Sequence, residues 1–171
     1  DPEALAGLRY PPPRLTRFTI DAVAGTVDEA RLFDRPGELP SVHPDRVSRR
    51  HRFVWATAKA HDTALPVYRS LVKWDVETGE ERVRDFGWGL PGEPLMVPRP
   101  GAVAEDDGWL LCLAYHLDAH RSSLHVLDAA TLDPVARLPL PHHVPPGFHG
   151  TWVRGAVSDT RVSRTAGPGA R

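Results

Sequence analysis

Short runs of apolar and β-branched residues, each bounded by turn residues, recur along the chain and predict β-strands. Three such runs are RLTRFTID (14–21), HRFVWATAK (51–59) and EDDGWLLCLAYHLD (105–118). In the second run, Phe53 and Trp55 fall on one face and Val54 on the other. No stretch shows a sustained helical period, and 18 prolines and 14 glycines interrupt the chain too often for long helices. The pattern therefore predicts an all-β fold.

Two hairpins are predicted, and their beginnings resemble each other. The first covers residues 70–87 with ETGE as its turn, and the second covers residues 122–141 around AATLD. The segments SLVKWDVETG (70–79) and SLHVLDAATL (123–132) share Ser, Leu, Asp and Thr in register, at an offset of 53 residues. This match indicates a repeated structural unit of about 50 residues.

A Pro-Gly signal recurs at nearly the same interval. It occurs in RPGELP, LPGEPL and PPGFHG, where Gly37, Gly92 and Gly147 are each 55 residues apart. Antiparallel strands repeating at about this period are typical of β-propeller blades, and coincidence among Pro- and Gly-rich loops is the alternative. About three repeats fit in this chain, and three blades do not close a propeller. We therefore expect the chain to form part of a larger propeller domain.

The residues that follow the Pro-Gly pairs are candidates for a metal centre. Equivalent positions on successive blades face one axis, so Glu38, Glu93 and His149 are expected to converge there. Imidazole is a good ligand for iron, copper or zinc, and a ligating histidine usually donates its other N–H to a carboxylate. The three side chains thus fit either one ligand with two orienting carboxylates or a mixed set of ligands. Taken alone, His149 is more often an ordinary loop histidine than a ligand.

Other histidines lie close together in the sequence without the spacing of a metal site. PHH contains His142 and His143, and YHLDAH contains His116 and His120. We interpret them as solvated residues at strand ends and turns, because a closed site needs three or four converging ligands.

Composition narrows the classes of protein further. The net charge of −1 argues against nucleic-acid binding, and no apolar run approaches a membrane span. Cys112 is the single cysteine, so an internal disulfide is excluded and the reducing cytoplasm is the expected compartment. We expect the Cys112 side chain to lie in the hydrophobic core. The start DPEALAGLRY has neither Met nor a signal-peptide core, which indicates a piece of a longer protein. Residues 154–171 are predicted to be a disordered tail.

From about Arg9 to Val153 the sequence resembles the C-terminal third of a carotenoid cleavage oxygenase. The matching runs are GELPSV, HRFVW, GEPLMVPRPGA, EDDGWLL, SSLHVLDAATL, VARLPLP and GFHGTW, in family order and spacing. The resemblance implies a seven-bladed β-propeller capped by helices, of which residues 1–153 form the C-terminal part with about three blades. It also implies a non-haem Fe(II) on the axis, held by four histidines from different blades, three of which are oriented by glutamates.

The same resemblance assigns roles to three residues. It makes His149, in FHG, the last iron ligand, and it makes Glu38 and Glu93 two of the orienting glutamates, which are expected to bond to histidines upstream. The other three histidine ligands and the third glutamate are expected before Asp1. The implied reaction is cleavage by O₂ of a conjugated double bond in a carotenoid, apocarotenoid or stilbenoid, giving two carbonyl products. The chain by itself is expected to be inactive.

A non-catalytic propeller module that binds a partner fits the repeats equally well. FHG together with the two GE motifs favours the iron dioxygenase, and the absence of G-x-S-x-G disfavours a hydrolase. The implied partners are a lipophilic polyene or stilbenoid and O₂, with no nucleic acid and no partner protein. A peripheral membrane contact is compatible with the resemblance, although the sequence contains no clear apolar patch for it.

Overall fold

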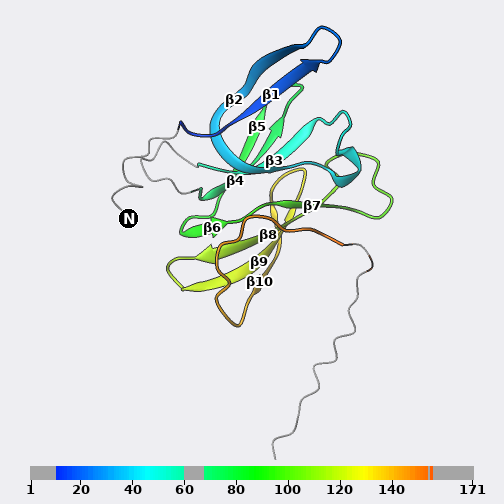
Figure 1. Cartoon of the computed structure of the whole chain (residues 1–171). Helices are drawn as coiled ribbons and strands as arrows, with labels where there is room; N and C mark the ends of the chain where they lie inside the picture. The colour runs from blue at the N-terminus through cyan, green and yellow to red at the C-terminus, as the bar shows by residue number, and fades with distance from the viewer. Residues whose placement is uncertain (1–10, 60–67, 154, 156–171) are drawn as a thin grey trace, which may run out of the picture.

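The structure, a computed structural model, describes residues 11–59, 68–153 and 155, and strands make up nearly all of its regular structure (Figure 1). The first sheet has the strand order β1-β2-β3-β4-β5, and the second has the order β10-β9-β8-β6, with β7 also paired to β8. All pairings are antiparallel. The first sheet contains β1 (Arg14–Asp21), β2 (Thr26–Ser41), β3 (Phe53–Ala58), β4 (Ser70–Asp75) and β5 (Glu81–Asp85). The second contains β6 (Gly89–Pro91), β7 (Leu95–Pro98), β8 (Gly108–His116), β9 (Arg121–Asp128) and β10 (Pro134–Pro139).

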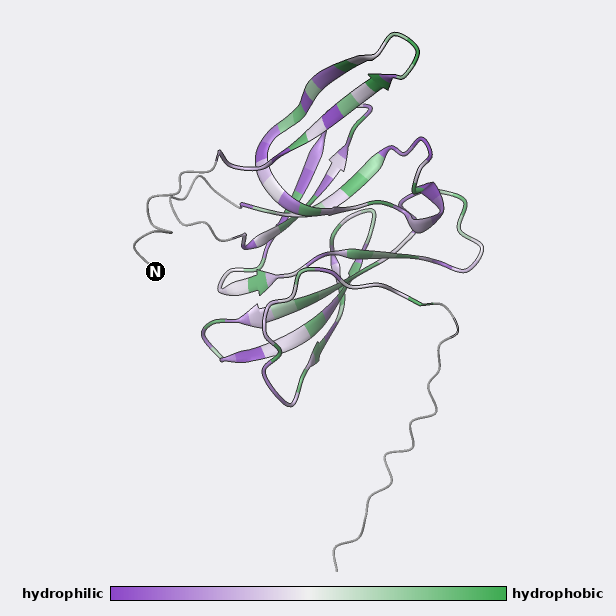
Figure 2. Ribbon diagram, viewed as in Figure 1, coloured by the Kyte–Doolittle hydropathy of each residue, from purple (hydrophilic) through white to green (hydrophobic). Residues whose placement is uncertain are grey.

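The predicted all-β fold is confirmed for the described residues, whose one helix is the short 3-10 helix η1 (Pro44–Arg46). The three predicted strands correspond to β1, β3 and β8, and the two predicted hairpins correspond to β4–β5 and β9–β10. Strands β6 and β7 were not predicted, and neither was β2. Its first half is exposed and pairs only with β1, so it carries little of the apolar patterning that identifies a buried strand. In Figure 2 the residue hydropathy varies between hydrophilic and hydrophobic along both strands of the β1–β2 hairpin.

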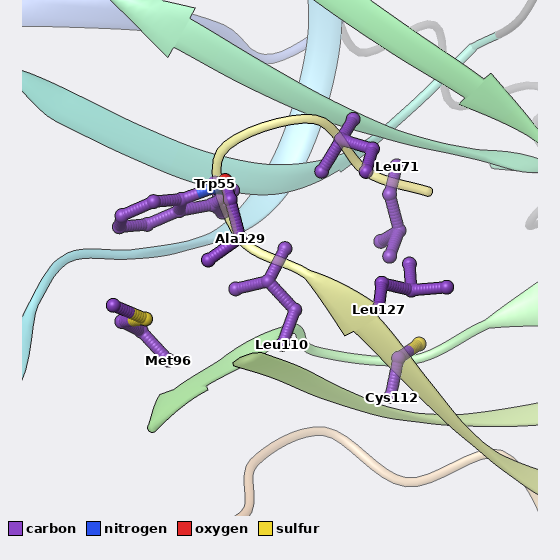
Figure 3. Close-up of a cluster of buried hydrophobic side chains, with 8 residues drawn as sticks. Trp55, Leu71, Met96, Leu110, Cys112, Leu127 and Ala129 are labelled. Atoms are coloured by element: carbon purple, nitrogen blue, oxygen red, sulfur yellow. Dashed lines mark hydrogen bonds between the residues drawn. The ribbon is translucent and has the colours of Figure 1, made fainter. Parts of the chain in front are cut away.

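The two sheets pack against each other through a shared hydrophobic core (Figure 3). Trp55 of β3 and Leu71 of β4 come from the first sheet and meet Leu110 of β8 and Leu127 of β9 from the second. The indole Nε1 of Trp55 also donates a hydrogen bond of 3.0 Å to the carbonyl oxygen of Ala129. This bond satisfies the one polar group that the buried indole carries and fixes one sheet against the other.

A second cluster covers the opposite face of the first sheet. It contains Phe33, Val54, Ala56, Ala58, Val72 and Trp74, all of them buried. Phe33 and Trp74 stack with their ring centroids 5.3 Å apart. Strands β3 and β4 are therefore buried on both faces, and the predicted division of Phe53 and Trp55 from Val54 is confirmed.

The 53-residue repeat is a structural one. Asp75 and Asp128 each end a strand, and the side-chain Oδ1 of each accepts backbone N–H bonds from the residues two and three positions later. In both turns a threonine three residues after the aspartate then accepts an N–H bond through its hydroxyl oxygen. The shared Asp and Thr thus build the same turn at the end of β4 and of β9.

The described residues form two sheets, whereas the Pro-Gly spacing predicted about three repeats. The third Pro-Gly pair lies in the segment 140–153, which forms no strand and passes beside the second sheet (orange in Figure 1). Pro-Gly marks a chain reversal and does not by itself require a strand after it, so equal spacing overcounted the sheets. The predicted tail at 154–171 lies outside the described residues, except Gly155. Within the described ranges, no helix has the length and hydrophobicity needed to cross a membrane.

Candidate functional site

Glu93 lies at a break between two short strands of the second sheet. β6 ends at Pro91 and β7 begins at Leu95, both pairing with β8, and the N–H of Gly92 donates a hydrogen bond of 2.9 Å to the carbonyl oxygen of Leu113. The strand is thus held on both sides of the break while Glu93 leaves the ladder. Only 15% of the Glu93 side chain is exposed.

Glu38 occupies the corresponding break in the first sheet, 55 residues earlier. The pairing of β2 with β3 shifts register between Glu38 and Ser41, and Leu39 between them has a positive φ of 52°. The backbone carbonyl of Glu38 accepts a hydrogen bond of 3.0 Å from the hydroxyl of Thr57. Both GE motifs therefore mark an irregularity in strand pairing that frees a carboxylate from the sheet.

His149 meets Glu93 at this position. The Nδ1 atom of His149 lies 3.4 Å from Oε1 of Glu93, and the backbone N–H of Gly150 donates a bond of 2.8 Å to Oε2. One carboxylate thus holds both the imidazole and the backbone of the FHG segment. The contact engages Nδ1, which leaves Nε2 as the nitrogen available to a metal. The His149 side chain is 73% exposed.

The three predicted residues line one pocket of about 440 Å³. Its polar members include Glu38, Glu93 and His149, and Tyr68 stands beside Glu38. Its apolar wall includes Leu90, Leu95, Leu111, Leu113, Leu124, Val144 and Phe148. The structure therefore brings the three residues to one pocket, which combines two carboxylates and one imidazole with an extended apolar surface.

The partner of Glu93 differs from the sequence-based expectation, whereas that of Glu38 stays a prediction. Both were expected to bond to upstream histidines, but the partner of Glu93 in the structure is His149 itself. Tyr68 lies beside Glu38, and burial, followed by the charge of Glu38 and hydrogen bonding to it, raises the pKa of Tyr68. Sequence reasoning missed Tyr68 because a tyrosine 30 residues from its partner carries no local signal.

The histidines outside the motif divide into two groups. His120, His142 and His143 are exposed, as predicted. His116 lies at a strand end as predicted, being the last residue of β8, but the prediction that it is solvated is wrong, because it is partly buried beside His125 of β9. His125 was missed because its nine-residue separation from His116 becomes a contact only once the two strands pair.

The described part of the chain brings no three His, Cys, Asp or Glu side chains close enough to hold a metal ion. His149 fits such an ion as a single ligand, because a carboxylate engages one ring nitrogen while the ring is exposed to the pocket. A complete centre would need further ligands from outside the described residues.

Comparison with known proteins identifies the family. The protein-family model described as retinal pigment epithelial membrane protein matches residues 2–154. The chain is 47% identical over 146 residues to apocarotenoid-15,15'-oxygenase of Synechocystis, and this match covers 84% of this chain and 30% of that protein. It is 35% identical over 145 residues to the carotenoid cleavage oxygenase of Mycobacterium tuberculosis, which covers 82% of this chain and 29% of that protein.

Solved structures agree with the sequence matches. The cobalt-substituted apocarotenoid oxygenase of Synechocystis superimposes with a TM-score of 0.78 at 47% identity, over 82% of this chain and 30% of that one. A chimera of that enzyme with the retinal pigment epithelial protein superimposes with the same TM-score at 43% identity, over 82% of this chain and 30% of the chimera. The chain thus spans about 30% of the length of these relatives. It belongs to the family of the retinal pigment epithelial membrane protein and the carotenoid cleavage oxygenases.

Proposed function

We propose that this chain is part of a non-haem Fe(II) dioxygenase that cleaves a conjugated carbon–carbon double bond of a carotenoid, apocarotenoid or stilbenoid. The observation that carries the proposal is the contact of His149 Nδ1 with the Glu93 carboxylate inside the 440 Å³ pocket. A carboxylate on one imidazole nitrogen fixes the ring orientation and increases the basicity of the other nitrogen. In this role His149 binds Fe(II) through Nε2.

Glu93 positions His149 in two ways. Oε1 faces the imidazole, and Oε2 accepts the N–H of Gly150, so the ring and its backbone are held by one rigid group. Glu38 sits at the equivalent break of the neighbouring sheet, and we assign it the same task toward a second histidine from outside the described residues. Tyr68 lines the same pocket and interacts with this carboxylate. When bound, Fe(II) activates O₂ for the cleavage of the double bond.

The pocket wall fits a lipophilic substrate. Leucines from β7, β8 and β9 line it together with Val144 and Phe148, and these side chains offer a polyene dispersion contacts while excluding water. The relatives named above include oxygenases of apocarotenoids and carotenoids, and one was crystallised with cobalt substituted into it. These facts favour a polyene substrate and a metal centre.

The finer architecture is part of the same proposal. We infer that residues 1–153 belong to the C-terminal part of a seven-bladed propeller, with the two sheets as two of its blades. The cytoplasm is the expected compartment, with a peripheral membrane contact as the route for a lipophilic substrate.

A chimera tests the proposal. Residues 2–154 would replace the matching segment of the Synechocystis apocarotenoid-15,15'-oxygenase, and iron content and O₂-dependent cleavage of an apocarotenoid would be measured. We expect an iron-containing, active chimera. His149→Ala should abolish iron binding and cleavage, whereas His142→Ala, an exposed histidine of the same loop region, should alter neither.

Two outcomes would contradict the proposal. Normal iron content in the His149→Ala chimera would remove the residue from the metal centre. A folded chimera without iron or cleavage would instead favour the non-catalytic binding module, which fits the same repeated sheets.

A further inference from the structure

A second group of potential metal ligands lies on the core-facing side of the second sheet. The Nε2 atom of His116 is 2.6 Å from the hydroxyl oxygen of Ser123, which is 3.1 Å from Nε2 of His125. The two Nε2 atoms are 3.4 Å apart. Two imidazole nitrogens and one hydroxyl oxygen thus converge on one point.

Strand register produces this convergence. Ala114 pairs with Ser123 and Cys112 pairs with His125, so Ser123 and His125 share the face of the sheet that holds Cys112. His116 follows Ala114 by two residues and falls on that face as well. The neighbouring positions Leu113 and Tyr115 point to the opposite face and line the pocket of His149. The group is therefore separate from the proposed iron centre.

The distances suit a metal ion. Three atoms with these separations share a centre about 1.8 Å from each of them, which is shorter than the roughly 2.0–2.1 Å of a zinc–imidazole bond. An ion about 1 Å outside their plane can therefore bond to all three. We propose that His116, Ser123 and His125 bind a first-row transition-metal dication that prefers imidazole, Zn²⁺ or Cu²⁺, with water completing its coordination.

The charge state of the two histidines supports this assignment. Burial, followed by the charges of His116, Arg137 and Arg84, lowers the pKa of His125 to about 4. Burial and Arg137 also lower the pKa of His116, against a smaller opposing effect of Asp118. Both imidazoles are therefore neutral at pH 7, which is the form that binds metals.

Arg137 opposes a cation at this position. Its Nε donates a hydrogen bond of 3.2 Å to the Ser123 hydroxyl, and its positive charge repels a dication. Imidazole ligands still favour Cu²⁺ and Zn²⁺ over Mg²⁺ or Ca²⁺, which prefer oxygen ligands. Because the Arg137 charge opposes the metal ion, we expect that removing this charge tightens metal binding.

Titration of the metal-free protein with Zn²⁺ and with Cu²⁺, against a chromophoric chelator, tests the site. We expect saturable binding of one ion, weakened at least about 10-fold by His116→Gln and by His125→Gln. Arg137→Gln should strengthen binding several-fold. His120→Gln is the matched control, because this exposed histidine contacts Tyr115 on the opposite face and should leave affinity unchanged.

The Cu²⁺ electron paramagnetic resonance spectrum gives a readout that does not depend on affinity. Hyperfine structure from two imidazole nitrogens in the unsubstituted protein, falling to one in either folded Gln variant, supports the site. If a variant does not fold, the spectrum of the unsubstituted protein decides, since one nitrogen or none overturns the proposal. Equal weakening by His116→Gln, His125→Gln and His120→Gln would also overturn it, because it would indicate nonspecific surface binding.

Discussion

Gly79 and Leu132 occupy the same position in two equivalent turns, and both have a positive φ, 78° and 63° respectively. The N–H of each donates a hydrogen bond of 2.9 Å to the carbonyl of the aspartate that begins its turn, Asp75 or Asp128. Glycine adopts this conformation without strain, whereas leucine does not. Leu132 is only 2% exposed and belongs to the core between the sheets, so its burial offsets the strained backbone.

The first prediction concerns Gly79, in the turn between β4 and β5. Gly79→Ala should lower the free energy of unfolding by about 1 kcal/mol, because an added Cβ meets no atom within 4 Å and only the positive φ opposes it. Urea denaturation of the protein measures the change. Gly147→Ala is the control, since that site is equally open and carries no positive φ. Equal stability of Gly79→Ala and the parent would show that the turn relaxes freely.

The hairpins were predictable because their information is local. Asp75 and Asp128 bond to backbone groups two and three residues away, and a glycine marks one of the turns. Leu132 shows the limit of such reasoning, since a leucine in a left-handed conformation is explained only by the core that receives it. The exposed half of β2 was missed for a related reason, because hydrogen bonding to β1 holds it without a buried face.

The site was predictable to a similar degree. Even spacing and the resemblance singled out Glu38, Glu93 and His149, and all three line one pocket. Their partners could not be predicted, because a sequence separation of 56 between Glu93 and His149 gives no indication of which carboxylate the imidazole meets. The contact of His116 with His125 likewise depends on the register of two strands.

The second prediction compares the glycines of the two GE motifs. A Cβ at Gly37 would lie 2.6 Å from the indole of Trp74 and 2.9 Å from the carbonyl oxygen of Thr57, both buried. Gly37→Ala should therefore lower the free energy of unfolding by about 1–3 kcal/mol. At Gly92 the nearest atom is the Leu113 carbonyl oxygen at 3.3 Å, so Gly92→Ala should cost less than about 1 kcal/mol. Equal losses in urea denaturation would contradict this difference.

The third prediction concerns acid stability. Hydrogen bonds from the Arg52 guanidinium hold the pKa of the Asp75 carboxyl well below its usual 3.8. The folded protein therefore binds this proton less readily than the unfolded chain, and the carboxylate's contribution to stability is complete above about pH 4 and lost as pH falls below it. Asp75→Asn should lower stability at pH 7 and reduce its loss between pH 5 and pH 2.

Urea denaturation across this pH range measures both effects. Asp34→Asn is the control, because Asp34 is 93% exposed and its contact with Arg31 is a surface ion pair of little energetic weight. An acid dependence in Asp75→Asn as steep as in the parent would show that other carboxyl groups dominate the transition.

The fourth prediction separates the two tasks of Glu93. In Glu93→Gln the side-chain oxygen can still accept the Gly150 N–H, but the negative charge facing His149 is lost. In this variant the loop should stay in place while iron affinity or turnover of the chimera falls about 10- to 100-fold. Glu93→Ala should lower iron affinity and turnover further, because it also removes the acceptor of the Gly150 N–H. Glu105→Gln is a matched control, because that carboxylate also accepts backbone N–H bonds, from Arg52 and Phe53, but lies outside the pocket. Glu105→Gln should leave iron affinity unchanged, and an unchanged affinity in Glu93→Gln would mean that only the backbone contact matters.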